Sequence, residues 1–334
     1  MKNDNYKIAF VGFRHGHIYS LYNKAAEHAS VEIVAACEEN AEARAAVPPS
    51  VKITHTSWAD MLANTDCNIV AIGDYYSKRG QLALDALSAG KHVILDKPIC
   101  TTLAELDEME ALAKRNNLRI GCMLDLRESP SFISARQAIR DGLIGRVTQI
   151  QFGGQHPLLR ETRAGWYFEE GKHGGTINDI GIHAVDMFSF LTGESVKRIV
   201  AARTWQAFDV RCESFNDAAQ FMLELGNGCG VLGDVSYAAP DSQGYTLPTY
   251  WRFNVWGTRG VLEFNISDPH VTAYLDGEKS GKSLEAPKDA DPDFLDSFLS
   301  DIQGKQVDLD TAAVIAASRM TLKIQAFADR EAGR

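Results

Sequence analysis

The sequence predicts an α/β protein of two domains: an N-terminal Rossmann-like, doubly wound parallel sheet, then a C-terminal α+β domain with a large, mainly antiparallel sheet. The length of 334 residues is enough for two domains of ordinary size. Up to about residue 124, short apolar runs alternate with helical patterns, as they do in parallel sheets. Beyond residue 125, longer segments of alternating apolar and polar residues dominate, which is typical of antiparallel strands. We therefore place the domains at residues 1–124 and 125–334.

Five nearly continuous apolar runs are predicted as the strands of the first sheet: Lys7–Val11, Val31–Cys37, Ile69–Ile72, His92–Leu95 and Leu118–Met123. The helices between them have recognisable ends. Ser57 and Thr102 each open a capping-box pattern, which satisfies the first backbone N–H groups of a helix. Ser77 is predicted to cap a further helix, which ends before Gly90. This alternation of strands and helices indicates a doubly wound sheet.

The second domain is predicted to begin with a helix that follows Pro130 and ends before Gly142. Its clearest strands are Val147–Phe152, Ile199–Trp205, Ala218–Leu225 and Tyr250–Trp256. The segment Leu225–Gly228 contains Asn-Gly, which predicts a hairpin with a primed turn. Two further helices are predicted, one from Asp291 and one from about Asp310 to Arg330.

The charge and the cysteine pattern exclude several classes of protein. There are 34 lysines and arginines against 44 aspartates and glutamates, so the formal net charge is −10. Because nucleic acids and anionic membranes bind clustered basic residues, neither is a predicted partner. No apolar run approaches the ~18 residues of a membrane span, and the N-terminal residues lack the apolar stretch of a signal peptide. The six cysteines are scattered, which predicts a reduced, cytoplasmic protein without disulfides or a zinc cluster.

The first predicted strand runs into the turn Gly12-Phe-Arg-His-Gly-His17. A glycine-rich turn between a strand and a helix lets the backbone approach the pyrophosphate of a dinucleotide, usually with the pattern GxGxxG. Here Arg14 occupies the second glycine position and His17 the third. The turn therefore predicts a dinucleotide site, but an ordinary strand–helix turn is an alternative that many α/β proteins contain.

Glu38 strengthens the dinucleotide interpretation. It closes the second predicted strand, 22 residues after Gly16, where a carboxylate can accept hydrogen bonds from an adenosine ribose. A carboxylate at that position would repel a 2′-phosphate, so NAD is the predicted cofactor and NADP is less favoured. The alternative is a solvated acid at the end of a strand.

Three further residues could carry chemistry. Lys97 directly follows the fourth strand, at the edge where doubly wound sheets bind ligands, and its ammonium could polarise a substrate oxygen; the alternative is a surface lysine. Asp179 and His183 are four residues apart and share one face of a predicted helix, although they could instead be a helix N-cap and a buried core histidine. A metal site made of these two residues and Asp186 does not match a zinc spacing, so no metal is predicted.

Four segments, which together cover most of the chain in order, resemble the Gfo/Idh/MocA family of NAD(P)-dependent oxidoreductases. This family includes glucose–fructose oxidoreductase and inositol dehydrogenases. The segments and the family patterns that they resemble are Ala89–Pro98 (AGKHVxxEKP), Asp141–Val147 (GxIGxV), Gly174–Asp186 (GGxxxDxGxHxxD) and Trp256–Gly260 (GTxG). The first segment has Asp96 where the family has glutamate.

The resemblance implies roles for individual residues. His183 would exchange the hydroxyl proton, Lys97 would polarise the same oxygen, and Asp179 would orient the substrate or the lysine, while hydride passes between the substrate carbon and the nicotinamide. The implied cofactor-binding residues are Gly12, Phe13, Arg14, His15, Glu38, Gly73, Asp74, Tyr75, Asp96 and Lys97. The implied substrate-binding residues are Lys97, Arg127, Trp166, His173, Asp179 and His183.

The chain also departs from the family pattern at three further points. Arg14 and His17 alter the glycine-rich turn. The family's usual Thr-Pro-Asn reads Gly73-Asp-Tyr-Tyr76 here, and its following histidine appears as Arg79. The pyrophosphate geometry at the first turn, and the nicotinamide and substrate contacts of the second loop, therefore do not follow from the resemblance.

Three hypotheses of function follow. The first is an NAD-dependent oxidoreductase that interconverts a hydroxyl and a carbonyl on a sugar, inositol or related polyol. The second keeps NAD bound and uses transient oxidation to cleave a glycoside or epimerise a sugar. The third is a non-catalytic sensor of a nucleotide or sugar, which would have no need of the three catalytic-type residues. The resemblance also implies a homodimer or homotetramer formed through the sheet of the second domain.

Overall fold

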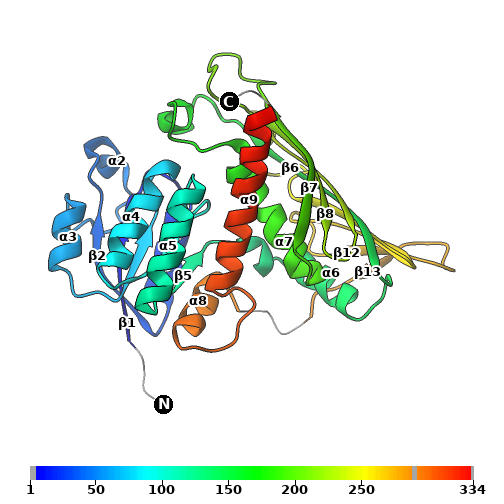
Figure 1. Cartoon of the computed structure of the whole chain (residues 1–334), viewed down its shortest axis with the longest axis horizontal. Coiled ribbons are helices and arrows are strands. Elements are labelled where there is room, and N and C mark those ends of the chain that lie inside the picture. The colour runs from blue at the N-terminus through cyan, green and yellow to red at the C-terminus, as the bar shows by residue number, and fades with distance from the viewer. Residues whose placement is uncertain (1–4, 288–291, 332–334) are drawn as a thin grey trace. The chain divides into compact units, whose positions relative to one another are not determined.

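The computed structural model describes residues 5–287 and 292–331, which form two compact units (Figure 1). The first unit comprises Met1–Met123, Ala164–Gly174 and Phe294–Ser318. The second comprises Leu124–Arg163, Gly175–Asp293 and Arg319–Arg334. Two later segments of the chain therefore complete the first unit. The division into domains at 1–124 and 125–334 stays a prediction.

The first unit contains a parallel sheet of five strands in the order β2-β1-β3-β4-β5, which confirms the predicted Rossmann-like architecture. The strands are β1 (Tyr6–Val11), β2 (Val31–Cys37), β3 (Ile69–Ile72), β4 (His92–Leu95) and β5 (Ile120–Cys122). The last is shorter than the predicted Leu118–Met123, because Leu118 still belongs to the end of the preceding helix. Its N–H donates to the carbonyl of Ala113 at 2.8 Å, after Asn117 has adopted a left-handed conformation.

The helices of the first unit are α1 (Ile18–Glu27), α2 (Ala41–Ala46), α3 (Trp58–Asn64), α4 (Tyr76–Ser88), α5 (Leu103–Asn116) and α8 (Phe294–Ile302). The predicted capping box at Thr102 is complete. Ser57 caps α3 through its side chain, as predicted. The predicted cap at Ser77 is wrong, since α4 begins one residue earlier and Ser77 donates its N–H to Lys172. Gly90 follows the end of α4 with a φ of 75°.

The outer edge of β5 is covered by the segment that enters the first unit near the end of the chain. Thr311 Oγ1 accepts the N–H of Ile120 at 3.0 Å. The ring of Phe298 on α8 lies where a side chain at Gly121 would be, with 2.7 Å between Cδ2 and an added Cβ. Residues 191 and 177 positions later in the sequence thus complete strand β5.

The second unit contains a sheet of eight strands in the order β13-β12-β11-β10-β6-β9-β8-β7. Neighbouring strands are antiparallel except for the parallel pair β6 and β9, which confirms the mainly antiparallel prediction. The strands are β6 (Val147–Pro157), β7 (Val196–Trp205), β8 (Ala218–Leu225), β9 (Gly230–Ala239), β10 (Arg252–Gly257), β11 (Gly260–Asn265), β12 (Val271–Leu275) and β13 (Lys282–Leu284).

Helices α6 (Pro130–Arg140) and α7 (Ile182–Thr192) belong to this unit, and α9 spans Thr311–Glu331. Helix α6 packs on the sheet through Phe132, whose ring lies 5.3 Å and 5.1 Å from the rings of Phe253 and Phe264. The helix predicted after Pro130 is confirmed, and Gly142 follows it with a φ of 70°. Part of the prediction of a helix from Asp291 lies outside the described residues, and the helix itself begins at Phe294.

The predicted hairpin between β8 and β9 is confirmed, but its turn is of another type. The N–H of Gly228 donates to the carbonyl of Leu225, and Gly228 is the residue of this turn with a positive φ, of 83°. A primed turn would need positive φ at both central residues, Gly226 and Asn227. An ordinary turn followed by a left-handed glycine therefore replaces the predicted primed turn.

Among the described residues, none of the helices combines the length and the apolar composition that a membrane span requires.

Candidate active site

All ten predicted cofactor residues lie at one edge of the parallel sheet. Gly12–His15 follow β1, Glu38 follows β2, Gly73–Tyr75 follow β3, and Asp96 and Lys97 follow β4. Strand β1 pairs with β2 on one side and with β3 on the other, so the strand order reverses at β1. In doubly wound sheets ligands bind at the carboxyl ends of the strands beside such a reversal. The fold thus brings these ten residues to the edge where a dinucleotide is expected.

Two glycines allow the turns after β1 and β3 to touch. Gly12 has a φ of 78°, and a Cβ on it would lie 2.5 Å from the Cβ of Asp74. A Cβ on Gly73 would lie 2.1 Å from the carbonyl oxygen of Gly12. Any side chain at either position would force the two turns apart.

The beginning of α1 has no side-chain cap, although the N–H groups of Tyr19 and Ser20 donate to the carbonyls of Gly16 and His17 at 3.2 and 2.9 Å. His17 precedes the helix without capping it through its side chain, and the first turn contains no acidic residue. No atom lies within 4 Å of the position of a Cβ on Gly16. The dipole of a helix attracts anions to its N-terminus. These residues fit the pyrophosphate of a dinucleotide, even though the second and third glycines of the usual pattern are missing.

Arg14, at the second glycine position, is held by carboxylates. Its Nε lies 2.8 Å from Asp74 Oδ1 and 4.0 Å from Glu38 Oε1, and its guanidinium lies over the Tyr75 ring at 4.6 Å. Glu38 accepts the N–H of Phe13 at 2.6 Å, and it is only 1% exposed. Its other oxygen accepts the N–H of Asn40 at 2.8 Å, so both oxygens already have a backbone donor, and the ribose contact of Glu38 stays a prediction.

Arg79 joins the turns after β3 and β4 through its hydrogen bonds. Its side chain is fully buried and donates to the carbonyls of Gly73, Asp74, Asp96, Lys97 and Pro98, and also to Asp96 Oδ2 at 2.8 Å. A guanidinium offers five N–H donors in a fixed plane, which suits this many acceptors. The sequence showed Arg79 only as a departure from the family pattern. These hydrogen bonds hold the backbone of Asp96 and Lys97 in place.

A chain of hydrogen bonds runs from Asp96 through two tyrosines. His15 Nδ1 contacts Asp96 Oδ2, His15 Nε2 lies 3.2 Å from the Tyr76 hydroxyl, and that hydroxyl lies 2.8 Å from the hydroxyl of Tyr167. Burial lowers the pKa of His15 to about 3, although Asp96 acts in the opposite direction. A neutral His15 therefore donates from Nδ1 and accepts at Nε2.

Trp166 and His173, two of the predicted substrate residues, lie beside this chain. Trp166 Nε1 donates to the carbonyl of Arg14 at 3.0 Å. The His173 ring lies 5.3 Å from the rings of Tyr76 and Tyr167. Both residues belong to the first unit, and their contact with substrate stays a prediction.

The buried His15 should make stability depend on pH. An unfolded chain protonates a histidine near pH 6.5, whereas folded His15 stays neutral down to about pH 3. The contribution of His15 to the unfolding free energy is fully present above the pKa of the unfolded histidine. It is lost progressively as pH falls below that pKa. Between about pH 7.5 and about pH 5, we expect the wild type to lose roughly 2 kcal/mol more unfolding free energy than His15→Asn. Urea unfolding of both proteins at the two pH values measures this; equal losses would contradict a neutral His15.

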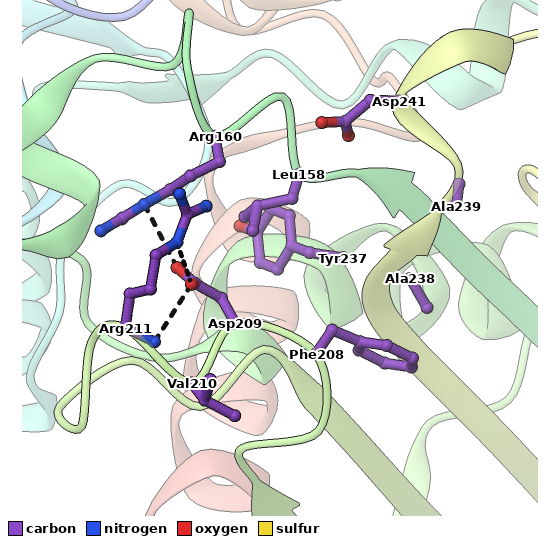
Figure 2. A pocket seen from close by; sticks show the side chains of 10 residues that line it. All are labelled: Leu158, Arg160, Phe208, Asp209, Val210, Arg211, Tyr237, Ala238, Ala239 and Asp241. Atoms are coloured by element: carbon purple, nitrogen blue, oxygen red, sulfur yellow. Dashed lines mark hydrogen bonds and ion pairs between the residues drawn. The ribbon is translucent and has the colours of Figure 1, made fainter.

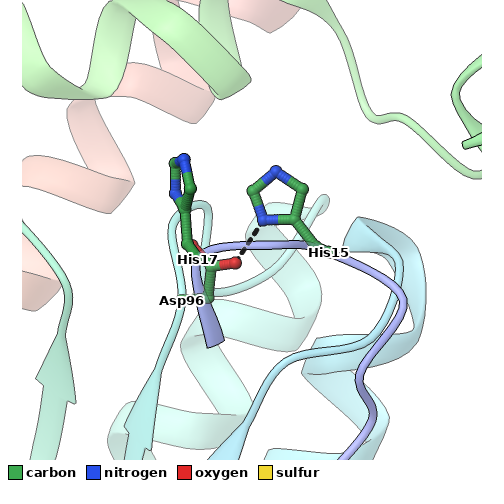
Figure 3. Close-up of side chains that lie close together, drawn as sticks. All are labelled: His15, His17 and Asp96. Carbon is green, nitrogen blue, oxygen red and sulfur yellow. Dashed lines mark hydrogen bonds and ion pairs between the residues drawn. The ribbon is translucent and has the colours of Figure 1, made fainter. Parts of the chain in front are cut away.

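His15, His17 and Asp96 form the one group of potential metal ligands found among the described residues (Figure 3). One ligand atom from each lies within 4.8 Å of the others. However, Arg79 contacts the same carboxylate at 2.8 Å, and Arg79, His15 and His17 outweigh burial to hold the pKa of Asp96 well below its usual value. Asp96 is thus already neutralised by a guanidinium that would repel a metal cation. The cluster, in which His15 and Asp96 are buried and His17 is exposed, fits a polar network better than a metal site.

Asp179 lies in the second unit, in a short π-helical turn (Ile177–Gly181) that leads into α7. The helix predicted for this segment is therefore correct in place but begins with a wider turn, a feature often found at functional sites. Gln325 holds its start by accepting the N–H of Ile177 at 2.9 Å. Gly175 makes room for this contact, since a Cβ there would lie 2.3 Å from Gln325 Cδ.

Asp179 and His183 are both nearly buried, at 2% and 4% exposure. The Tyr237 hydroxyl donates to Asp179 Oδ2. The His183 ring lies 4.8 Å from the ring of Trp251, and its Nδ1 lies 4.0 Å from Asp125 Oδ1. Tyr237 and Trp251 were not predicted from the sequence, because buried aromatic residues in alternating strands carry no signal of a site.

Arg127, the remaining predicted substrate residue, forms a buried ion pair. Its Nε and Nη2 donate to the two carboxylate oxygens of Asp186 at 2.8 Å and 2.5 Å. This pair ties α7 to the short turn that precedes α6 and gives Asp186 a structural role. The substrate contact of Arg127 stays a prediction.

Comparison with known proteins places both halves of the chain in one family. Residues 6–123 match the oxidoreductase family with an NAD-binding Rossmann fold. Residues 132–263 match the GFO/IDH/MocA C-terminal domain. The chain belongs to the Gfo/Idh/MocA family.

Two curated relatives of this Gfo/Idh/MocA protein are sugar dehydrogenases. The levoglucosan dehydrogenase of Pseudarthrobacter phenanthrenivorans is 26% identical over 236 residues, which cover 63% of this chain and 58% of that protein. The D-apiose dehydrogenase of Paraburkholderia graminis is 28% identical over 267 residues, which cover 77% and 67%. The chain spans about half the length of the first curated relatives it matches, between 38% and 58%.

The fold is also shared with a solved Gfo/Idh/MocA-type structure. Levoglucosan dehydrogenase in complex with NADH superposes with a TM-score of 0.81 at 19% identity, over 98% of both chains. At this identity the likeness shows the fold alone.

Proposed function

We propose that this Gfo/Idh/MocA protein is an NAD-dependent oxidoreductase that interconverts a hydroxyl and a carbonyl on a sugar, inositol or related polyol. The observation that carries the proposal is the gathering of the ten predicted cofactor residues at the carboxyl ends of β1 to β4, beside the reversal of strand order at β1. The names of the curated relatives, levoglucosan dehydrogenase and D-apiose dehydrogenase, support a sugar as the substrate. NAD, when bound, would supply the hydride acceptor.

Lys97, Asp179 and His183 are the proposed catalytic residues, because they lie in the sequence motifs that resemble those of the family. The Lys97 ammonium would draw electron density from the reacting oxygen. His183 would take the hydroxyl proton, and the Asp125 carboxylate 4.0 Å from its ring would stabilise the resulting imidazolium. Tyr237 holds the carboxylate of Asp179, which would accept a substrate hydroxyl group or orient the lysine.

Binding and turnover together test the proposal. Nucleotide-free protein is titrated calorimetrically with NAD⁺ and with NADP⁺, and sugars and polyols are then screened for NADH formation by absorbance. Tight NAD⁺ binding with stoichiometric NADH supports the proposal. Product without net NADH would favour the rival enzyme that cleaves or epimerises sugars by transient oxidation. Binding of neither nucleotide would contradict the proposal and favour the sensor or a scaffold.

Glu38 should determine the choice between the two nucleotides. Glu38→Gln removes the negative charge that would face a 2′-phosphate, so we expect the preference for NAD⁺ over NADP⁺ to fall by about ten-fold or more. The matched control is Glu39→Gln, which removes the neighbouring carboxylate that pairs with Lys78 at the surface. The same calorimetric titration measures both variants. A preference that Glu38→Gln leaves unchanged would show that Glu38 does not face the nucleotide.

A homodimer or homotetramer formed through the second sheet is also proposed. Met222 and Leu232 are directly paired on β8 and β9, and they are 43% and 44% exposed. Phe221 alternates with Met222 and is buried on the other face. Exposed apolar side chains in adjacent strands favour association with a second copy. Sedimentation of the wild type should give at least twice the mass of 36.7 kDa, and a monomer at micromolar concentration would contradict it.

The cytoplasm remains the proposed location. In the part of the chain that the structure describes, no disulfide joins the cysteines, which are Cys37, Cys67, Cys100, Cys122, Cys212 and Cys229, and this is in keeping with a reducing compartment.

A further inference from the structure

A cavity of about 400 Å³ lies in the second unit, beside the ends of β6 and β9 and the loop between β7 and β8 (Figure 2). Its walls include Arg160, Phe208, Asp209, Arg211, Tyr237 and Asp241. None of these residues has a part in the proposed catalytic chemistry except Tyr237. Pockets for small molecules span roughly 300–1,000 Å³, so the cavity is large enough for a sugar ring.

Tyr237 joins this cavity to the candidate catalytic aspartate. Its side chain forms one wall, and its hydroxyl donates to Asp179 Oδ2. Tyr237 itself is 2% exposed and is fixed between the rings of Phe215 and His156, at 5.2 Å and 6.2 Å. A molecule in the cavity would therefore lie one side chain away from a group bound at Asp179.

The charges of the cavity are balanced. Asp209 accepts from Arg211 Nε at 3.0 Å, and its other oxygen lies 3.3 Å from Arg160 Nε (Figure 2). Asp241 adds a second carboxylate, which accepts the N–H of Leu159 at 2.7 Å. Two guanidinium groups and two carboxylates line the cavity, and Glu161 also pairs with Arg211 at 2.9 Å, so no excess positive charge attracts an anion. Donors and acceptors fixed side by side suit the hydroxyl groups of a neutral sugar.

Phe208 presents an apolar ring at the rim of this polar cavity. It is 56% exposed, which is unusual for so large an apolar side chain. The loop is nevertheless rigidly held, because the buried carboxylate of Asp217 accepts the N–H groups of Ala207, Phe208 and Asp209 at 2.7, 2.9 and 2.5 Å. An exposed ring on a fixed loop loses little conformational entropy when a ligand packs on it.

We propose that this cavity binds the second ring of a neutral disaccharide or glycoside whose first ring reacts at Asp179 and His183. The substrate class is then a two-ring sugar, with the apolar C–H face of the second ring on Phe208 and its hydroxyl groups on the Asp209 and arginine pairs. This inference rests on the proposed function for the reacting ring, but the binding of the second ring does not require turnover.

The test uses the full chain saturated with NAD⁺. Maltose, cellobiose, lactose and sucrose are titrated calorimetrically, and so are glucose, galactose and fructose. We expect at least one disaccharide to bind about ten-fold or more tightly than its constituent monosaccharides, and Phe208→Ala to remove that advantage. Arg211 is a second exposed residue of the wall, and Arg211→Ala should lower the affinity for the same disaccharide. The matched control is Tyr274→Ala, which removes another exposed aromatic ring, 47% exposed, on β12.

Binding and NADH formation are read separately, so the two proposals can fail separately. A disaccharide that binds through Phe208 but yields no NADH would support the cavity and overturn the dehydrogenase. If a monosaccharide yields NADH and a second ring adds no affinity, the proposal for the cavity is contradicted, whereas the proposal of a dehydrogenase is supported. Equal losses in Phe208→Ala and Tyr274→Ala, or disaccharides that bind no better than monosaccharides, would also overturn the cavity proposal.

Discussion

Replacing Lys97 by methionine is expected to lower kcat by about a thousand-fold and to leave the affinity for NAD⁺ nearly unchanged. Lys97 is the second residue after β4 and is 3% exposed, so methionine, of similar length, can fill the same space without the charge. Removing a group that stabilises charge developing on a reacting oxygen costs roughly two to three orders of magnitude. Steady-state rates of NADH formation, together with calorimetric NAD⁺ affinity, measure the two effects.

The matched control for this variant is Lys114→Met. Lys114 is an exposed lysine on α5, away from the edge of the sheet where the cofactor residues lie, and its replacement should leave kcat unchanged. A Lys97→Met protein that keeps full activity would remove Lys97 from the proposed chemistry. A variant that loses NAD⁺ binding and activity together would make Lys97 a cofactor residue instead.

Replacing Arg79 by methionine is expected to destabilise the protein by about 3–5 kcal/mol, because it leaves the buried Asp96 carboxylate without its strongest partner. It also leaves the carbonyls of Asp96, Lys97 and Pro98 without a donor. The free energy of unfolding in urea measures the loss. Arg79→Lys should recover only part of it, since an ammonium cannot reach acceptors that lie in one plane.

Arg198→Met is the control for Arg79. Arg198 pairs with Glu224 at 2.7 Å on the surface of the second sheet, and it is 64% exposed. Solvent screens such a pair, so its loss should change the unfolding free energy little. An equal effect of the two variants would mean that the network around Asp96 does not hold the turns together.

The parts of the fold that could be predicted are those that one local pattern determines. Buried parallel strands read as continuous apolar runs, and four of the five predicted runs coincide with β1 to β4 within one residue. The capping box at Thr102 was predictable, because its partners are three residues apart. The cap at Ser77 was not, since serine is common at the start of helices but the fold bonds its N–H to Lys172, far along the chain.

The candidate site divides in the same way. Residues that follow strands closely, such as Glu38 and Lys97, could be predicted because ligands bind at the carboxyl ends of the strands in doubly wound sheets. Arg79 and Tyr167 were missed as members of the site. Their hydrogen bonds join segments that are distant in sequence, and no periodic pattern records which buried polar side chain meets which. The fixed loop that carries Phe208 depends in the same way on one buried carboxylate, at Asp217.

The completion of β5 by late residues also bears on how the chain is synthesised. The N–H of Ile120 finds its acceptor on Thr311, and the face at Gly121 is covered by Phe298. Until the ribosome has released these residues, the first unit exposes an unpaired strand edge and a bare apolar face, features that invite aggregation. We infer that the nucleotide-binding half matures only near the end of translation, and that a fragment ending at residue 123 would be an unstable remnant rather than an independent domain.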